Sequence, residues 1–326
     1  MKVLAGDIGG TRTRLGLFDI TDGRLREQVV ETFPSQTHRS LADIVTRFLD
    51  RNDDRPEQAC FGIAGPVRGR LVRLTNLPWS VDATDLEQRF GFRRVALLND
   101  LEATGWGIPA LEPGDLVTLN EGAPDATGHG AVIAAGTGLG EAGLFRGKAG
   151  FLPCASEGGH ADFAPDDELQ WALRQFLAAR YGHVSWERVV SGPGLVNLHD
   201  FLREYRGDPL PAALAEAMQS GDPAAVVARA ALSGEDALCG EALDLFVRLY
   251  GAEAGNLALK TMATGGVYVA GGIAPRILPA MTDGRFLAAF KAKGRMEPLL
   301  AAMPVHVILN DRVALYGPAR YLTRQD

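Results

Sequence analysis

A strand–turn–strand unit rich in glycine and threonine occurs twice in this chain and constrains its fold more than any other feature. The first turn is Gly6-Asp7-Ile8-Gly9-Gly10-Thr11, and the second is Gly136-Thr137-Gly138-Leu139-Gly140. Short apolar runs precede and follow both turns, and the returning runs share Gly-Leu-Phe at 16–18 and 143–145. An apolar run, a glycine turn and a second apolar run predict a β-hairpin. We therefore expect each hairpin to open one domain.

The rest of the chain alternates between apolar runs typical of strands and segments with helical periodicity. Strands are expected at 60–64, 95–98, 267–270 and 305–309, and helices at 40–51, 167–181, 211–232, 235–262 and 313–322. This alternation predicts an α/β fold. A length of 326 residues exceeds what a single core usually serves. Two α/β domains facing each other across a cleft explain the order better than one continuous sheet, with a boundary near 105–109.

The composition and charge exclude several classes of protein. Hydrophobic residues make up 46% of the chain and charged residues 22%, as in an ordinary globular protein. The net charge of −7 argues against a nucleic-acid partner, since such proteins normally present a basic face. It also fits an anionic membrane surface poorly, and no apolar run approaches the ~20 residues that span a bilayer. We expect neither nucleic acid nor a membrane as a partner.

The cysteines and the first residues predict the compartment. Cys60, Cys154 and Cys239 stand far apart and form no CxxC pair, which favours reduced thiols over a disulfide framework. Asp7 follows Met1 before any long apolar stretch, so no signal peptide is expected. The sequence therefore predicts a soluble, cytoplasmic protein.

Both glycine turns are candidate phosphate loops, because paired glycines let backbone N–H groups approach phosphate oxygens. In the first turn, Thr11 and Thr13 can add hydroxyl donors, and Asp7 can hold the waters around a Mg²⁺ ion. A plain hairpin explains this turn equally well when it is taken alone. The turn at 136–140 lacks the spacing of a Rossmann or Walker A loop. As a pair, two hairpins from two domains are expected to hold one polyphosphate.

Asn99-Asp100 ends the apolar run at 95–98 and is the candidate catalytic pair. The carboxyl ends of strands in α/β folds face ligand crevices, and an Asp placed there can accept the proton of an attacking hydroxyl. The alternative is that the pair only caps the helical segment at 101–105. The residues alone leave both interpretations open.

A second group of polar residues suits a sugar. Glu157 and His160 lie in Ser156-Glu157-Gly158-Gly159-His160, and Glu187 follows further on. Two acids and an imidazole can bind several hydroxyls, each as donor or acceptor. Zinc bound by His160 and Cys154 is the competing interpretation, which is disfavoured because no further Cys or His is spaced to complete a four-ligand set.

Two further motifs are ambiguous. Asn76 beside Trp79 suits the face of a sugar, although Trp in a chain of this size usually belongs to the core. Gly271-Gly272 follows the apolar run at 267–270. Paired glycines there let a flat base approach the backbone, and they equally suit a tight strand-to-helix turn without a ligand.

Taken in order, these motifs resemble the bacterial glucokinase family, which is part of the actin/hexokinase/heat-shock ATPase superfamily. The matching motifs are GDIGGT at 6–11, GIAGPV at 62–67, TNLPW at 75–79, Asn99-Asp100, AGTGLG at 135–140, SEGGHADFAP at 156–165, ERVVSGPGL at 187–195 and VAGGIAPR at 269–276. The resemblance covers nearly the whole chain, and eight motifs in register are far more specific than any one of them.

The resemblance implies a fold, a reaction and a set of site residues. The fold would be two actin-like (ribonuclease H-like) α/β domains closing on a central cleft, with 1–108 plus 312–326 as the smaller and 109–311 as the larger. The reaction would be ATP-dependent phosphorylation of D-glucose at its C6 hydroxyl, with Asp100 as general base. The sugar would be bound by Asn76, Asn99, Asp100, Glu157, His160 and Glu187. The nucleotide would be bound by Gly6, Asp7, Ile8, Gly9, Gly10, Thr11, Gly136, Thr137, Gly138, Gly271 and Gly272.

The resemblance also implies ATP and Mg²⁺ as cofactors, with Asp7 reaching the metal through water, and a homodimer. The chain departs from the family at Arg12, where Asn is usual, and at Cys154-Ala155-Ser156, where Pro-Gly is frequent. Rival functions are a non-catalytic sugar sensor on the same scaffold and a broader hexokinase. The intact candidate base and both hairpins favour an enzyme, and the lack of a Cys cluster after His160 disfavours the zinc-containing amino-sugar kinases.

Overall fold

The computed structural model describes residues 1–21, 24–52, 54–74, 76–148 and 150–323. Thr75, the first residue of the TNLPW motif, therefore lies outside the described residues. The chain divides into two compact units, the first comprising Met1–Pro113, Gly147–Ala155 and Asn310–Asp326, and the second Gly114–Arg146 and Ser156–Leu309. The domain bounds drawn from the sequence stay a prediction.

The first unit is built on a five-stranded sheet with the order β3-β2-β1-β4-β7. Its strands are β1 (Lys2–Ile8), β2 (Arg12–Thr21), β3 (Arg24–Pro34), β4 (Gln58–Ile63) and β7 (Arg94–Asn99). Strands β1, β2 and β3 pair antiparallel, and β4 lies parallel to both β1 and β7. The expected first hairpin is confirmed, with Ile8 opposite Thr13 at its end.

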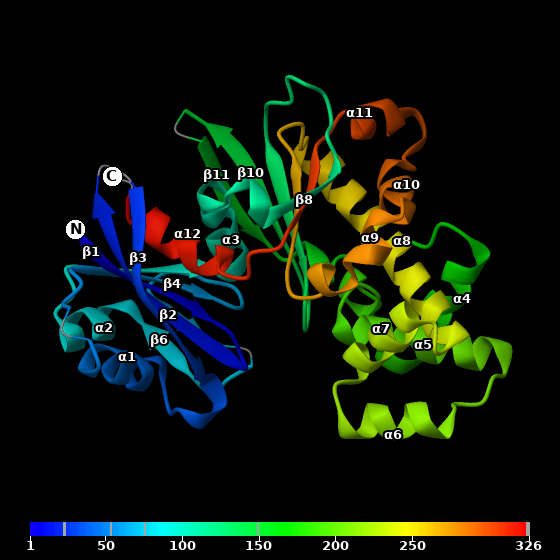
Figure 1. Cartoon of the computed structure of the whole chain (residues 1–326), viewed down its shortest axis with the longest axis horizontal. Coiled ribbons are helices and arrows are strands. Elements are labelled where there is room, and N and C mark those ends of the chain that lie inside the picture. Colours follow the sequence, from blue (N-terminus) through cyan, green and yellow to red (C-terminus); the bar gives the residue numbers. More distant parts are fainter. Residues whose placement is uncertain (22–23, 53, 75, 149, 324–326) are drawn as a thin grey trace. The chain divides into compact units, whose positions relative to one another are not determined.

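Helices cover both faces of this sheet (Figure 1). They are α1 (Leu41–Asp50), α2 (Ala83–Phe90), α3 (Asp100–Gly107) and α12 (Val313–Tyr321), and a small hairpin is formed by β5 (Leu71–Arg73) and β6 (Ser80–Asp82). Successive side chains of a strand point to opposite faces. Leu4 of β1 accordingly packs in one core with α1 and α2, whereas Val3 and Ala5 pack in another with α3 and α12. The sheet is thus buried on both sides.

The sheet of the second unit contains β10-β9-β12-β13-β8 in this order. The strands are β8 (Leu116–Asn120), β9 (Gly130–Ala135), β10 (Leu139–Gly147), β12 (Val267–Ala270) and β13 (Val305–Ile308). A further strand, β11 (Gly150–Ser156), lies almost wholly in the segment Gly147–Ala155 of the first unit. Strand β10 pairs antiparallel with β9, and β12 lies parallel to β9 and β13. Leu139 faces Ala135, which confirms the second expected hairpin.

Most helices belong to the second unit. They are α4 (Glu168–Tyr181), α5 (Gly192–Arg206), α6 (Ala212–Ser220), α7 (Pro223–Ser233), α8 (Ala237–Thr261), α9 (Leu278–Thr282), α10 (Arg285–Lys291) and α11 (Glu297–Ala301). The long helix α8 packs against α5, α7 and α10. The segment expected to be helical at 211–232 is helical but consists of two helices, because the chain breaks before Pro223 and Asp222 caps a new helix there.

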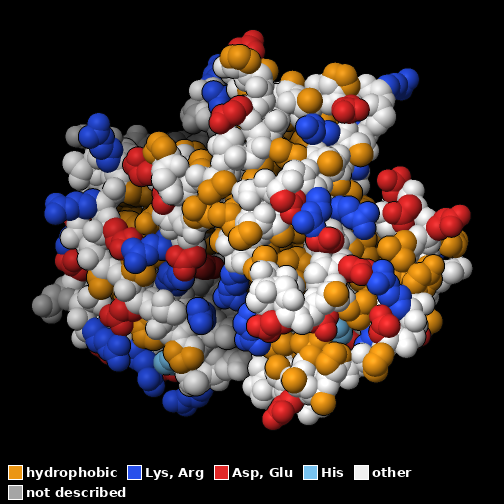
Figure 2. Space-filling view, turned by 45° about the vertical axis from the view of Figure 1, so that its right-hand side comes forward, with side chains coloured by type: hydrophobic (Ala, Val, Ile, Leu, Met, Phe, Trp, Pro, Cys, Tyr) orange, Lys and Arg blue, Asp and Glu red, His pale blue; other side chains and the backbone are white. Residues whose placement is uncertain are grey.

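The surface is mixed in character. Acidic, basic and hydrophobic side chains are interspersed on the face shown in Figure 2. Within the described part of the chain, no helix combines the length and the hydropathy that crossing a membrane requires.

Candidate functional site

The turn of the first hairpin presents backbone donors from which no other described residue accepts. Gly9 N–H donates to the Arg12 carbonyl oxygen at 2.9 Å and closes the turn. Neither Gly10 nor Thr11 donates a backbone hydrogen bond to another described residue. A Cβ atom on Gly10 would lie 2.9 Å from the Asn76 Cβ, so the close approach of Asn76 requires a glycine. Two adjacent N–H groups of this kind suit an anionic oxygen.

The two hydroxyls expected beside these donors have different environments. Thr11 is exposed, whereas Thr13 is fully buried with its Oγ1 2.9 Å from the Ser35 Oγ. The Ser35 hydroxyl donates its one hydrogen to the Gly9 carbonyl oxygen at 2.8 Å. Thr13 must therefore be the donor in the Thr13–Ser35 bond. The expectation that Thr13 adds a donor for phosphate is wrong, and Thr11 is the hydroxyl left at the turn.

Asp7 lies near the end of β1, directly opposite Arg14 of β2. Burial raises the pKa of Asp7 to about 6, while the positive charge of Arg14 opposes the shift and Asp311 adds to it. Arg14 is held by Asp311, donating to its carbonyl oxygen at 2.6 Å and to its carboxylate at 2.8 Å. One carboxylate beside a phosphate loop fits Mg²⁺, which usually takes one or two carboxylates and keeps several waters.

The second hairpin repeats the arrangement of free donors. Gly136 N–H donates to the Gly138 carbonyl oxygen at 2.8 Å, and Gly192 N–H donates to the Gly136 carbonyl oxygen at 2.8 Å. Among the described residues, no partner accepts from the N–H groups of Thr137 and Gly138. The next N–H, on Leu139, donates to the Glu187 Oε2 at 3.0 Å. Each hairpin thus presents a threonine and two N–H groups that donate to no described residue.

The predicted sugar residues of the second unit lie close to this hairpin. The Glu187 Oε1 is 3.9 Å from the His160 Nδ1, and both side chains are partly or largely exposed. Glu157 is also exposed and directly precedes the short 3-10 helix Gly158–His160. The first N–H of this helix, on Gly158, donates to the Ser156 Oγ at 2.9 Å. The structure therefore brings His160 and Glu187 together, with Glu157 on the same short segment as His160.

The Asn99-Asp100 pair lies where strand β7 meets helix α3. Strand β7 ends at Asn99, which caps α3 by accepting from Leu101 N–H at 3.0 Å and from Glu102 N–H at 3.3 Å. Its amide also donates to the Gly65 carbonyl oxygen at 3.0 Å. Asp100 is the first residue of α3, and its Oδ1 accepts from Leu101 N–H at 3.0 Å. The capping alternative is thus confirmed for Asn99.

The two ambiguous motifs resolve differently. Trp79 is buried in the core with α1 and α2, so the core interpretation of this residue is confirmed, while Asn76 is exposed beside Gly10. Gly271 has a φ of +85° and packs so closely on the Ala135 backbone that a Cβ would overlap it. A Cβ on Gly272 would meet no atom within 4 Å. The Gly271-Gly272 turn therefore lies beside the turn of the second hairpin, with its second glycine open.

Sequence reasoning missed Ser35 altogether. It begins the short 3-10 helix Ser35–Thr37 directly after β3, and nothing in its immediate sequence indicates that it contacts a turn 26 residues away. The long strand β3 was the one indication, because it pairs with β2 and brings the chain back beside the first turn, with Pro34 opposite Arg12.

The comparisons with known proteins agree along the whole chain. A family model described as Glucokinase matches residues 4–325. A glucokinase from Nostoc sp. is 44% identical, with 97% of each chain covered. The chain belongs to the glucokinase family. A glucokinase from Synechocystis sp. is 41% identical, with 98% of this chain and 97% of the relative covered.

The solved structures agree as well. The crystal structure of a glucokinase from an Antarctic psychrotroph superimposes with a TM-score of 0.85, at 31% identity and with 98% of each chain covered. The predicted family and the predicted pair of α/β domains of the sugar-kinase type are therefore confirmed. The roles of the individual site residues stay predictions.

Proposed function

We propose that this protein is an ATP-dependent glucokinase, which transfers the γ-phosphoryl group of ATP to the C6 hydroxyl of D-glucose. The products are glucose 6-phosphate, ADP and a proton. The main support is the length of the match to proteins named glucokinase, which covers at least 97% of this chain and of the Nostoc and Synechocystis relatives. A sugar sensor without catalysis would not require Asp100 and both hairpins, and this chain keeps all three.

In the first unit, we assign the proton acceptor and one phosphate loop. Asp100 would take the C6 hydroxyl proton as the phosphoryl group transfers, a role typically worth ~10²–10⁴ in rate. The free N–H groups of Gly10 and Thr11 would bind phosphate oxygens, where charge develops during transfer. Asn76 and Asn99 would bind sugar hydroxyls. Asp7 would hold Mg²⁺ through water, and the ion would supply positive charge to the phosphates.

In the second unit, we assign the other phosphate loop and three sugar ligands. Thr137 and Gly138 would bind phosphate oxygens, and Gly271-Gly272 would lie against the adenosine. Glu157, His160 and Glu187 would bind sugar hydroxyls. A site that pairs with each hydroxyl rejects sugars that lack one of them, because its polar groups would be left unpaired.

The family resemblance also supports a cytoplasmic homodimer. Light scattering on the purified protein would test the assembly, since a dimer has twice the mass of the 34.8 kDa chain.

A coupled assay of ADP release tests the activity directly. Purified protein with ATP, Mg²⁺ and glucose should release ADP in step with glucose 6-phosphate. Omitting glucose should reduce ADP release to a low background rate, because water is a poor phosphoryl acceptor in a site that is complete only with sugar bound. Saturable glucose binding with no glucose 6-phosphate formed would favour the non-catalytic sensor and overturn the proposal.

A further inference from the structure

Ser35 makes three hydrogen bonds to the first hairpin and is completely buried. Its N–H donates to the Thr11 carbonyl oxygen at 3.0 Å, and its hydroxyl donates to the Gly9 carbonyl oxygen at 2.8 Å. The same hydroxyl accepts from Thr13 Oγ1 at 2.9 Å. One side chain thus fixes residues on both sides of Gly10.

The bond to Gly9 determines where the next N–H points. The carbonyl of Gly9 and the N–H of Gly10 belong to one planar trans peptide unit, so they point in opposite directions. Because the Gly9 carbonyl oxygen faces Ser35, the Gly10 N–H faces away from Ser35. This N–H is one of the two donors at the turn that no described residue uses.

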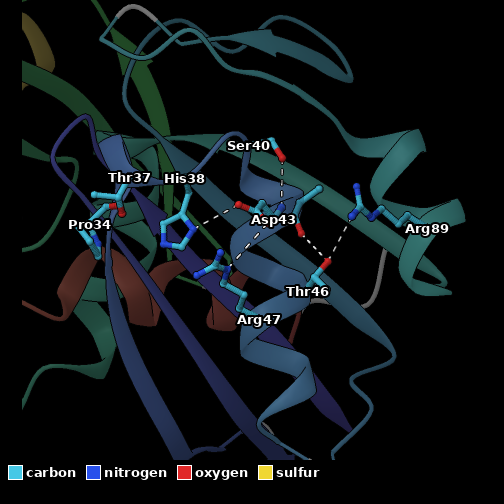
Figure 3. Close-up of polar contacts among 9 residues, drawn as sticks. Pro34, Thr37, His38, Ser40, Asp43, Thr46, Arg47 and Arg89 are labelled. Atoms are coloured by element: carbon cyan, nitrogen blue, oxygen red, sulfur yellow. Dashed lines mark hydrogen bonds and ion pairs between the residues drawn. The ribbon is translucent and has the colours of Figure 1, made fainter.

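Ser35 is itself held by the segment that links β3 to α1. The Ser35 carbonyl oxygen accepts from His38 N–H at 3.1 Å, and Thr37 Oγ1 donates to the Pro34 carbonyl oxygen at 2.9 Å. The buried His38 ring lies 3.4 Å from the Asp43 carboxylate in the first turn of α1, and the two side chains point toward one another (Figure 3). The link is therefore anchored to a helix that packs on the sheet.

We propose that Ser35 is a positioning residue for nucleotide binding, which orients the Gly10 N–H toward a phosphate of ATP through its hydrogen bond to Gly9. This inference rests on the proposed function, in which the first hairpin binds ATP. Removal of the Ser35 hydroxyl leaves the Gly9 carbonyl without its buried donor and lets the Gly9–Gly10 peptide rotate. The variant should therefore lose affinity for the nucleotide and keep its affinity for the sugar.

The test compares Ser35→Ala with Thr13→Val, measured on the full chain. Both variants break the Thr13–Ser35 hydrogen bond, so both should lose stability. Only Ser35→Ala removes the bond to Gly9. We expect Ser35→Ala to raise the Kd of Mg²⁺-AMPPNP and the KM for ATP roughly five- to tenfold, with the KM for glucose unchanged. Thr13→Val should leave both nucleotide constants within about twofold of the wild type.

Ser35→Cys provides a second variant should the alanine variant not fold. Its thiol is a weak donor of similar size, so it should give a nucleotide Kd between those of the wild type and Ser35→Ala. Two results would overturn the role of Ser35 and leave the proposed function standing. One is an equal effect of Ser35→Ala and Thr13→Val on nucleotide affinity. The other is an active enzyme in which neither Ser35→Ala nor Ser35→Cys changes nucleotide affinity. A wild-type protein that binds no Mg²⁺-AMPPNP would overturn this inference and the proposed function together.

Discussion

Glu187 accepts a hydrogen bond from the backbone N–H of Leu139, with 3.0 Å between Oε2 and N. Its other oxygen lies 3.9 Å from the His160 Nδ1. One carboxylate therefore contacts the second hairpin through one oxygen and approaches a predicted sugar ligand with the other. Ser191 Oγ fixes the backbone of Glu187 by donating to its carbonyl oxygen at 2.7 Å.

Gly138→Ala should disturb this arrangement with little cost to the fold. The new Cβ would overlap the Glu187 carboxylate, which is the far end of a flexible side chain and can move aside. Its bond to Leu139 would then break. We expect kcat/KM for glucose to fall at least ~10-fold, with a nearly unchanged Tm. Gly240→Ala in α8 is the matched control, since its Cβ would meet no atom within 4 Å, and it should keep normal kinetics. Normal kinetics for Gly138→Ala would show that the position of Glu187 does not affect the reaction.

Asp100→Asn tests the proton acceptor. The amide keeps the shape of the side chain and its contact at the start of α3 but cannot take a proton. We expect kcat to drop at least ~10²-fold while glucose still binds. Asp85→Asn is the control, because Asp85 also lies in the first turn of a helix of the same unit, α2. Near-normal turnover of Asp100→Asn in steady-state assays would remove Asp100 as the base.

Glu157→Gln and His160→Ala test the sugar ligands of the second unit. Each change leaves a sugar hydroxyl with a poorer partner, so the KM for glucose should rise at least ~10-fold and the KM for ATP should change little. His183→Ala is a suitable control, since this exposed His of the same unit bonds Asp162 at 2.7 Å and is assigned no ligand. An unchanged KM for glucose in both variants would place the sugar site elsewhere.

Features that depend on local sequence were predictable, and features that depend on distant contacts were not. The hairpin at Gly9-Gly10 was predictable because glycine turns and alternating apolar runs act over a few residues. The long periodic stretch that forms α8 was predictable for the same reason. Pro223 after Asp222 is also a local signal, and it marks the break between α6 and α7. The helical periodicity on both sides of the break hid this signal.

Only the structure shows which member of the Asn99-Asp100 pair caps α3. Both residues are good helix caps, so composition could not decide which one caps α3. The end of β7 decides it, because the strand stops at Asn99 and leaves Asp100 as the first helical residue. The role of Ser35 could not be predicted for a related reason, since its three partners belong to a hairpin that only the pairing of β2 with β3 brings near.

Asp7→Asn should abolish activity and stabilise the fold. The folded-state pKa of Asp7 is about 6, above its ordinary value of 3.8, so the folded protein holds this proton more tightly than the unfolded chain. Stability is therefore lost as the pH rises from 3.8 to about 6, and the loss persists above that range. An amide has no charge to bury, so at neutral pH the variant should melt about 2 °C or more above the wild type. A lower Tm at neutral pH would show that the Asp7 charge is stabilised by its surroundings.

Glu141 predicts a second pH dependence, in the second unit. This residue of β10 is buried together with Glu253 of α8, whose carboxylate lies 3.7 Å from Lys260. Burial and, after it, the negative charge of Glu253 raise the pKa of Glu141 to about 8. The folded protein keeps this proton while the unfolded chain loses it near 4.5. Stability should thus fall as the pH rises from about 4.5 to about 8.

Glu141→Gln should remove most of that fall. The amide reproduces the protonated carboxyl and can donate to Glu253, so the advantage of the variant in Tm should grow steadily between about pH 5 and pH 8. Melting curves of the wild type, Glu141→Gln and the exposed control Glu235→Gln would measure it across that range. Because Glu141 also packs against Gly158, between Glu157 and His160, the KM for glucose of the wild type should rise as Glu141 ionises, while that of Glu141→Gln should not. Parallel pH profiles for all three proteins would mean that Glu141 ionises at an ordinary pH. The Glu141–Glu253 pair would then not make the stability depend on pH in this range.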